Sequence, residues 1–193
     1  MPRGAAVADP GASPAFLFVI FLCLAGGVAA APAGEISVKA TRSGEVLEVE
    51  ATAELSASRA RAWEVLTDYN RLSEFVPDLH VSRIISRDGN NALVEQKGTV
   101  RFLFLTYPLE ARLAVTETPR TRIESQAVAG NFRELRCVYD LEVREGRLVL
   151  RYSGRLVPDF DVPLFLRTYV FRRSVEDTFR AMVEEIERGQ EQL

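Results

Sequence analysis

The sequence predicts an α+β fold in which a curved antiparallel sheet of about seven strands wraps around a long C-terminal helix. Residues 92–156 consist of successive stretches that alternate apolar and polar residues between short turns, which is typical of half-buried strands. Residues 164–186 carry apolar side chains at steps of three or four, the spacing of one helix face. One strand and two short helices precede the alternating stretches. This order of elements leaves an interior space between the sheet and the long helix.

Length and composition fit one ordinary domain. The chain has 193 residues, of which 47% are hydrophobic and 26% charged, and its 24 basic and 27 acidic residues leave a net charge of -3. A nucleic-acid-binding surface needs a concentrated basic face, which this balance does not offer. We therefore expect a single domain with one core and no nucleic-acid partner.

The N-terminal residues differ from the rest of the chain. Residues 10–34 carry no charge, and residues 16–24 are entirely apolar before small residues take over. This pattern is typical of a secretory signal peptide, here residues 1–30 with cleavage after Ala30. We expect the remaining domain, residues 35–190, to be exported to the periplasm or the outside of the cell. The alternative is an uncleaved leader that anchors the domain in a membrane.

Cysteine content argues against a metal centre. Cys23 lies in the expected leader, so Cys137 is the only thiol of the mature chain. One cysteine can form neither an internal disulfide nor a multi-cysteine zinc site, and we expect no metal and no cofactor. Nothing near Cys137 in the sequence would lower its pKa, so its expected role is that of a small core residue and not of a nucleophile.

The segment after the leader predicts one strand and two helices. Apolar and polar residues alternate over residues 47–55, which predicts a half-buried strand. Ser58 is a good N-cap for a helix that contains Trp63, which we expect to pack in the core. A second short helix begins near Leu72 and ends at Pro77.

Turn residues separate the strands that follow, at Asp88–Asn91, Pro119–Arg120, Gly130–Asn131 and Glu145–Gly146. In residues 92–104 the even positions are predicted to face inward, whereas Glu95, Lys97, Thr99 and Arg101 face water. The same alternation predicts a further inward set: Leu109, Ala111, Leu113, Val115, Ile123, Ser125, Ala127, Leu135, Cys137, Tyr139, Leu141, Val143, Leu148, Leu150, Tyr152 and Leu156. Asp161 and Pro163 signal the start of the last helix.

Few of the predicted inward residues can ionise. They include no Asp, Glu, Lys or Arg, and only Cys137, Tyr139 and Tyr152 can lose a proton. General acid/base catalysis needs a titratable group poised near neutral pH, so the interior is poorly equipped for it. His80 is the single histidine, and residues 79–87 alternate equally well in either register, so its side chain could face either way.

Two segments resemble a known family. Residues 62–69 (AWEVLTDY), followed by Leu72 and residues 75–77, resemble the opening signature of the polyketide cyclase/dehydrase and coenzyme Q-binding START-domain family, and residues 171–179 (FRRSVEDTF) resemble its C-terminal helix. The resemblance covers residues 46–188. It implies the START-like helix-grip fold of the SRPBCC superfamily, whose members include lipid and quinone carriers, hormone receptors and cyclases. No short catalytic motif of the family can be mapped onto this chain.

We expect non-catalytic binding or transport of a hydrophobic small molecule, such as a lipid, an isoprenoid or a quinone like coenzyme Q. Burying a polar side chain costs about 1 to 3 kcal/mol unless it forms a hydrogen bond. The polar side chains of the interior therefore either pair within the protein or orient the polar end of a ligand. The predicted ligand-binding residues are Gln96, Val100, Phe102, Phe104, Leu113, Ser125, Tyr139, Tyr152, Phe165 and Tyr169.

Two other functions remain open from the sequence. One is a polyketide cyclase/dehydratase-type enzyme in which Tyr139, Tyr152 or His80 transfers a proton. The other is a module whose interior is full and which binds another protein.

Apolar side chains are expected to gather at one end of the meander, where Phe104, Phe132 and Phe165 lie on three neighbouring links. Such a rim suits a ligand entrance and a peripheral membrane contact. The alternative is that these residues close over one another and cap the core.

Overall fold

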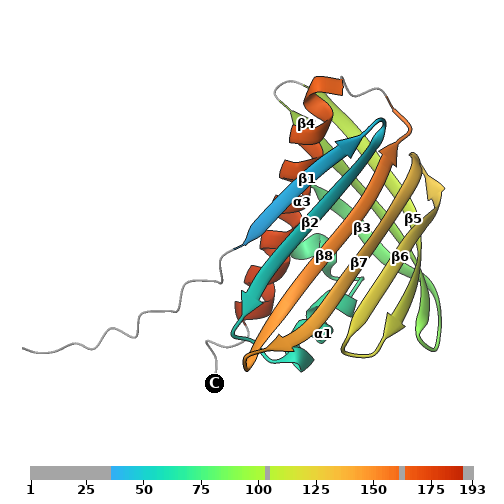
Figure 1. Ribbon diagram of the computed structural model, residues 1–193. Coiled ribbons are helices and arrows are strands. Elements are labelled where there is room, and N and C mark those ends of the chain that lie inside the picture. The colour runs from blue at the N-terminus through green and yellow to red at the C-terminus, as the bar shows by residue number, and fades with distance from the viewer. Residues whose placement is uncertain (1–35, 103–104, 161–163, 189–193) are drawn as a thin grey trace, which may run out of the picture. The chain divides into compact units, whose positions relative to one another are not determined.

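The computed structural model describes residues 36–102, 105–160 and 164–188 (Figure 1). The expected leader lies outside these residues. Within the described segments, no helix is long and apolar enough to span a membrane.

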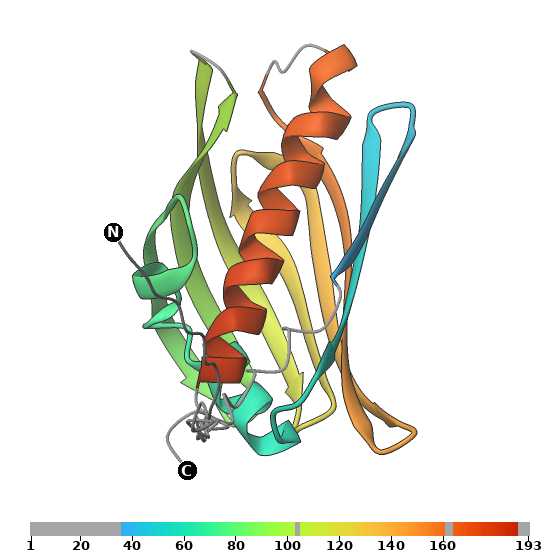
Figure 2. The same ribbon diagram turned by 90° about the vertical axis from the view of Figure 1, so that its left-hand side faces the viewer.

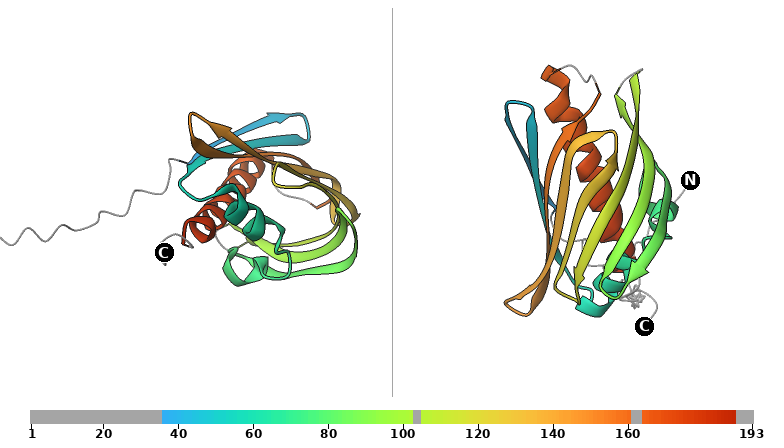
Figure 3. Two further views of the ribbon diagram at one scale, coloured as in Figure 1. Left: turned by 90° about the horizontal axis from the view of Figure 1, so that it is seen from below. Right: turned by 90° about the vertical axis from the view of Figure 1, so that its right-hand side faces the viewer.

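One antiparallel sheet holds the strands of the domain in the order β1-β2-β8-β7-β6-β5-β4-β3. Figures 2 and 3 show this sheet curving around a single long helix, which confirms the predicted α+β helix-grip architecture. The strands are β1 (Ser37–Ser43), β2 (Val46–Leu55), β3 (Leu79–Asp88), β4 (Asn91–Phe102), β5 (Leu105–Thr118), β6 (Arg122–Gly130), β7 (Phe132–Arg144) and β8 (Arg147–Pro158). The helices are α1 (Arg59–Thr67), α2 (Leu72–Phe75) and α3 (Leu164–Arg188).

Strand β1 was not predicted, and it brings the sheet to eight strands instead of about seven. Its sequence, SVKATRS, contains only two apolar residues, Val38 and Ala40, so its alternation is weaker than that of the other strands. It lies at the sheet edge and pairs only with β2, through a turn in which Gly44 has a φ of 62°. Because an edge strand needs only one neighbour, Val38 and Ala40 are enough to pack it against the core.

The predictions for β2 and the first helix are confirmed. The inward residues of β2 are no more than 3% exposed: Leu47, Val49, Ala51, Ala53 and Leu55. Ser58 caps α1, since its hydroxyl accepts a hydrogen bond of 3.2 Å from the backbone N–H of Arg61. Trp63 is half-buried against the core, as expected.

Two alternation predictions were wrong. Glu95 was expected to face water but is only 7% exposed, because Arg83, its register partner on β3, covers it and forms an ion pair with it. Val143 was expected inside but is 55% exposed. It lies next to the turn of the β7–β8 hairpin, whose tip extends beyond the end of α3 (Figure 2).

The C-terminal end of α3 is anchored to the corner between β2 and α1. Arg61 donates to the backbone carbonyl of Glu185 at 3.1 Å, and the backbone N–H of Ser56 donates to Glu187 at 2.7 Å. Near this end Phe179, Met182 and Ile186 are buried as predicted. The anchored helix therefore forms a fixed wall opposite the concave face of the sheet.

Candidate functional site

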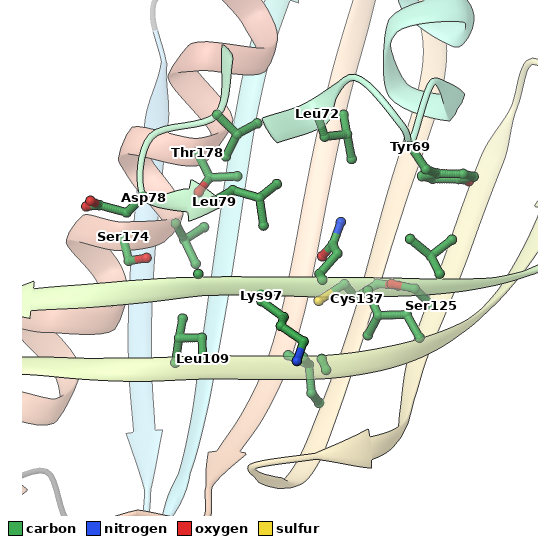
Figure 4. Close-up of a pocket in the computed structure, with 18 of the residues that line it drawn as sticks. Tyr69, Leu72, Asp78, Leu79, Lys97, Leu109, Ser125, Cys137, Ser174 and Thr178 are labelled. Atoms are coloured by element: carbon green, nitrogen blue, oxygen red, sulfur yellow. The ribbon is translucent and has the colours of Figure 1, made fainter. Parts of the chain in front are cut away.

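A cavity of about 240 Å³ lies between the concave face of the sheet and α3 (Figure 4). Strands β4 to β8, helix α3, the segment between α1 and α2, and the segment leading into β3 all contribute to its wall. Most of the lining is apolar, including Leu66, Leu72, Val76, Leu79, Val94, Leu109, Leu113, Val115, Ile123, Leu135, Leu156, Phe171, Val175 and Met182. Such a surface favours contact with an apolar molecule over water.

Half of the predicted ligand-binding residues line this cavity: Gln96, Leu113, Ser125, Tyr139 and Tyr152. Val100 is buried but lies outside the lining, further along β4. Tyr169 is 57% exposed, because it lies one residue beyond the α3 stripe that faces the sheet. The side chains of Phe102, Phe104 and Phe165 lie outside the described part of the structure. Contact between a ligand and the predicted ligand-binding residues stays a prediction.

Three of the polar side chains in the lining have partners within the protein. The amide of Gln96 donates to the Ser82 hydroxyl at 3.4 Å, and the Ser125 hydroxyl donates to the backbone carbonyl of Cys137 at 3.4 Å. The Tyr152 hydroxyl lies 3.3 Å from the Cys137 thiol. Pairing within the protein therefore accounts for most of the interior polarity that the sequence predicted.

Among the predicted inward polar side chains, Tyr139 is the exception. Its ring lies against that of Tyr152, with centroids 5.0 Å apart, but no hydrogen bond among the described residues involves its hydroxyl. Burial raises the pKa of Tyr139, so the phenol stays protonated at neutral pH. The hydroxyl is thus a neutral donor at the cavity wall.

The other ionisable groups beside Tyr139 also stay protonated. Burial, followed by the neighbouring Cys137, raises the pKa of Tyr152. Burial likewise raises the pKa of the Cys137 thiol, against the opposing effect of its hydrogen bonds with Tyr152 and Ser125. These groups can donate hydrogen bonds at neutral pH but are poor bases.

A glycine makes room for this arrangement. Gly154 faces Cys137 across β7 and β8, and a Cβ at this position would overlap the Tyr152 ring. The ring therefore lies over Gly154 with its hydroxyl at the Cys137 thiol.

An inward charged residue was missed by the sequence analysis. Glu117 is only 7% exposed and accepts hydrogen bonds from the Tyr69 hydroxyl at 2.9 Å and from both terminal nitrogens of Arg87 at 3.1 and 3.0 Å. The expectation that no inward position carries a charge was therefore wrong. Glu117 follows Val115 at the next inward step of β5, so extending the alternation by one step would have found it. It does not line the cavity itself, whereas Tyr69 does.

We call Glu117, Tyr69 and Arg87 the Glu117 cluster. This cluster lies at one end of the cavity, which we call the deep end. Burial, followed by the charge of Glu117, raises the pKa of Tyr69, whose ring closes this end. Figure 4 shows Tyr69, Ser125 and Cys137 toward this end, with Asp78 and Ser174 toward the other. Asp78 is exposed on the surface, so the lining reaches solvent beside Ser174 of α3.

His80 lies outside the cavity. Its side chain is exposed, with Nε2 3.4 Å from the Thr99 hydroxyl. A register shift between Leu79 and Val81 lets both Leu79 and Ser82 face inward, which settles the register that the sequence left open. Within the described residues, no three His, Cys, Asp or Glu side chains come together as metal ligands.

Near the predicted rim, four of the described aromatic residues form a cluster, which we define as Tyr107, Phe132, Phe160 and Phe171. The Phe160 ring stacks on Tyr107 at 5.5 Å and lies 6.3 Å from both Phe132 and Phe171. Asn131 ties the links together, since its side chain donates to the Pro108 carbonyl at 2.6 Å and its backbone carbonyl accepts from Asp159 at 2.9 Å. The three links do meet, and the described aromatic rings pack on one another. The side chains of Phe104 and Phe165 lie outside the described part of the structure.

Comparisons with known proteins agree with this architecture. The profile of the family described as polyketide cyclase/dehydrase and lipid transport matches residues 55–183. No curated protein matches the chain.

Several solved structures share the fold at low sequence identity. The Zhui aromatase/cyclase from Streptomyces sp. R1128 has a TM-score of 0.64 at 16% identity, over 74% of this chain and 94% of the other. A STAR-related lipid transfer protein from Xanthomonas axonopodis has a TM-score of 0.62 at 14% identity, over 78% and 93%. Human StAR-related lipid transfer protein 5 has a TM-score of 0.62 at 12% identity, over 80% and 83%. At these identities the likeness concerns the fold alone.

Proposed function

The chain belongs to the polyketide cyclase/dehydrase and lipid transport family, and from this premise we propose that it binds or carries a hydrophobic small molecule in its cavity without changing it chemically. The observation that carries the proposal is the lining, which is mostly apolar and includes a few neutral polar groups, while its charged members Asp78, Lys97 and Glu110 are all held in ion pairs. Ligand sites commonly combine apolar burial with a small number of orienting polar atoms. The lipid transfer proteins among the structural neighbours are consistent with such a ligand.

The cavity volume limits what can be buried. Pockets for drug-sized molecules range from about 300 to 1,000 Å³, and an engineered apolar cavity of about 150 Å³ holds benzene. A cavity of about 240 Å³ suits a compact apolar molecule or one segment of a longer one, such as a lipid, an isoprenoid or a quinone. A longer ligand would extend past Asp78 and Ser174.

Catalysis is the second candidate, and the aromatase/cyclase neighbour favours it. A cyclase or dehydratase would need a residue that exchanges a proton with its substrate. Tyr139 and Tyr152 line the cavity, but burial holds both in the protonated form, and the exposed His80 does not reach it. These properties suit hydrogen-bond donation better than proton abstraction, so binding is the function we propose.

Native mass spectrometry of the protein purified from the envelope fraction of its own cells tests this function. We expect a stoichiometric apolar molecule that organic extraction releases and that is recovered chemically unaltered after incubation with the protein. A protein that emerges empty and also ignores a panel of hydrophobic probes would contradict the proposal. A changed product would support the enzyme instead.

Export is part of the proposal, because the apolar segment of residues 16–24 suits a signal peptide. The intact mass of the same preparation reports on it. A mass that begins after residue 30 would fit a cleaved leader and a periplasmic or extracellular domain. The full-length mass in a membrane fraction would fit the anchored alternative.

We also propose that the end of the domain carrying Phe104, Phe132 and Phe165 contacts membranes. Apolar side chains gathered at one end can insert into the lipid interface. Substituting Phe104→Asp together with Phe165→Asp should leave the circular dichroism spectrum unchanged and reduce co-sedimentation with phosphatidylglycerol vesicles. Equal sedimentation of the variant and the wild type would rule out this contact.

A further inference from the structure

We propose that the cavity selects a neutral ligand with an oxygen acceptor, such as a ketone or ester carbonyl, and that the Tyr139 hydroxyl binds this oxygen at the deep end. The inference rests on the proposed binding function and names the chemical class of the ligand. It starts from the one tyrosine hydroxyl of the lining that is joined to no other group among the described residues. The Tyr139 side chain is only partly buried, so its hydroxyl is open to the cavity and can donate to a ligand oxygen.

The neighbouring hydroxyl groups already have hydrogen-bond partners within the protein. The hydroxyls of Ser125 and Tyr152 both lie at hydrogen-bond distance from Cys137, the first at its carbonyl and the second at its thiol. A ligand oxygen can therefore accept from Tyr139 without breaking an existing bond, whereas accepting from Ser125 would break its bond to the Cys137 carbonyl. This difference makes Tyr139 the primary anchor.

The surroundings of Tyr139 favour a neutral ligand over an anion. Tyr139 and Glu117 are both register partners of Ile123, so they lie two strands apart on the same face of the sheet. Arg87 is bound to Glu117 through both of its terminal nitrogens, and Lys97, the cation among the described lining residues, is paired with Glu110. A ligand carboxylate here would be buried without a free positive partner, which is strongly unfavourable.

The lining also fixes the direction of the ligand. Several neutral polar side chains lie at the deep end, including Tyr69, Ser125 and Cys137 (Figure 4). Beyond them the wall is mostly apolar and includes Phe132 and Phe171 of the aromatic cluster, with Asp78 and Ser174 where it reaches solvent. The acceptor oxygen therefore enters first, and the apolar body lies toward the aromatic cluster.

Three naphthalene probes of similar size test this selection by calorimetric titration at pH 7: 2-acetylnaphthalene, 2-isopropylnaphthalene and 2-naphthoate. We expect the ketone to bind more tightly than the hydrocarbon, and the carboxylate to bind most weakly. Tyr139→Phe should weaken ketone binding about tenfold and change hydrocarbon binding less than about twofold. Thr41→Val removes an exposed hydroxyl of β1 that lies outside the lining and serves as the control, with no effect on any probe.

Infrared spectroscopy gives a second readout that does not depend on a variant. The carbonyl stretch of 2-acetylnaphthalene bound to the wild type should lie at lower frequency than in hexane, and Tyr139→Phe should abolish this shift. An unshifted carbonyl in the wild type, or equal loss of ketone and hydrocarbon binding in Tyr139→Phe, would overturn the inference but leave the binding function intact. If none of the three probes binds to the wild type, the proposed function fails together with the inference.

Discussion

Replacing Arg87 by alanine should lower the free energy of unfolding by about 3 kcal/mol. Glu117 is 7% exposed, and Arg87 contacts both of its carboxylate oxygens. Without the guanidinium, the charge of Glu117 stays buried with only the Tyr69 hydroxyl as a partner. An uncompensated buried charge costs far more than the pair contributes, which is why removing one partner is so damaging.

Urea unfolding followed by circular dichroism measures this effect. Arg147→Ala is the matched control, because Arg147 pairs with Glu54 across β8 and β2 with both side chains well exposed. Exposed pairs contribute little, so this variant should unfold close to the wild type. The triple variant Arg87→Leu, Glu117→Leu and Tyr69→Phe should recover most of the lost stability, since it removes both charges and the hydroxyl that donates to Glu117. An Arg87→Ala variant as stable as Arg147→Ala would show that water reaches Glu117.

The same cluster shows where prediction from the sequence stopped. Alternation predicted the inward residues of β2 and β5 up to Val115, because apolar residues mark the buried face. Glu117 continues that face. A carboxylate can be buried there only with a cationic partner, and the partner of Glu117, Arg87, lies 30 residues earlier in the sequence. Local patterns contain no information on such a pairing, so a charged residue at an inward step is read as the end of the strand.

The sequence predicted which polar residues of the sheet face the cavity but not how their hydroxyls are paired. Ser125, Tyr139 and Tyr152 are inward residues by alternation, and the structure brings all three to the lining. Which hydroxyl stays without a partner depends on cross-strand register, because Cys137 lies beside Ser125 on one side and Gly154 on the other. The bulge at His80 could not be predicted for the same reason, because the register of β3 is fixed by its pairing with β4.

Filling the cavity should abolish binding without unfolding the protein, and Ala111→Phe is the sharpest way to do so. Ala111 is 7% exposed, lines the cavity from β5 and lies between Gln96 and Gly130 in the ladder. A cavity of about 150 Å³ is filled by benzene, so a phenyl group would take more than half of the room available. We expect affinity for 2-isopropylnaphthalene to fall at least about 100-fold, because the probe and the new ring cannot share about 240 Å³.

Ala114→Phe supplies the control, because Ala114 is exposed on the outer face of the same strand. Both variants place a residue that favours strands on β5, so they differ only in the face that receives the ring. Calorimetry should show binding lost in Ala111→Phe and unchanged in Ala114→Phe, while urea unfolding should find both near the wild type, since a ring that enters empty space causes no overpacking. Undiminished binding to Ala111→Phe would place the ligand elsewhere. A loss of about 1 to 3 kcal/mol in its stability would instead mean that side chains already fill the interior, as expected for a module that only binds other proteins.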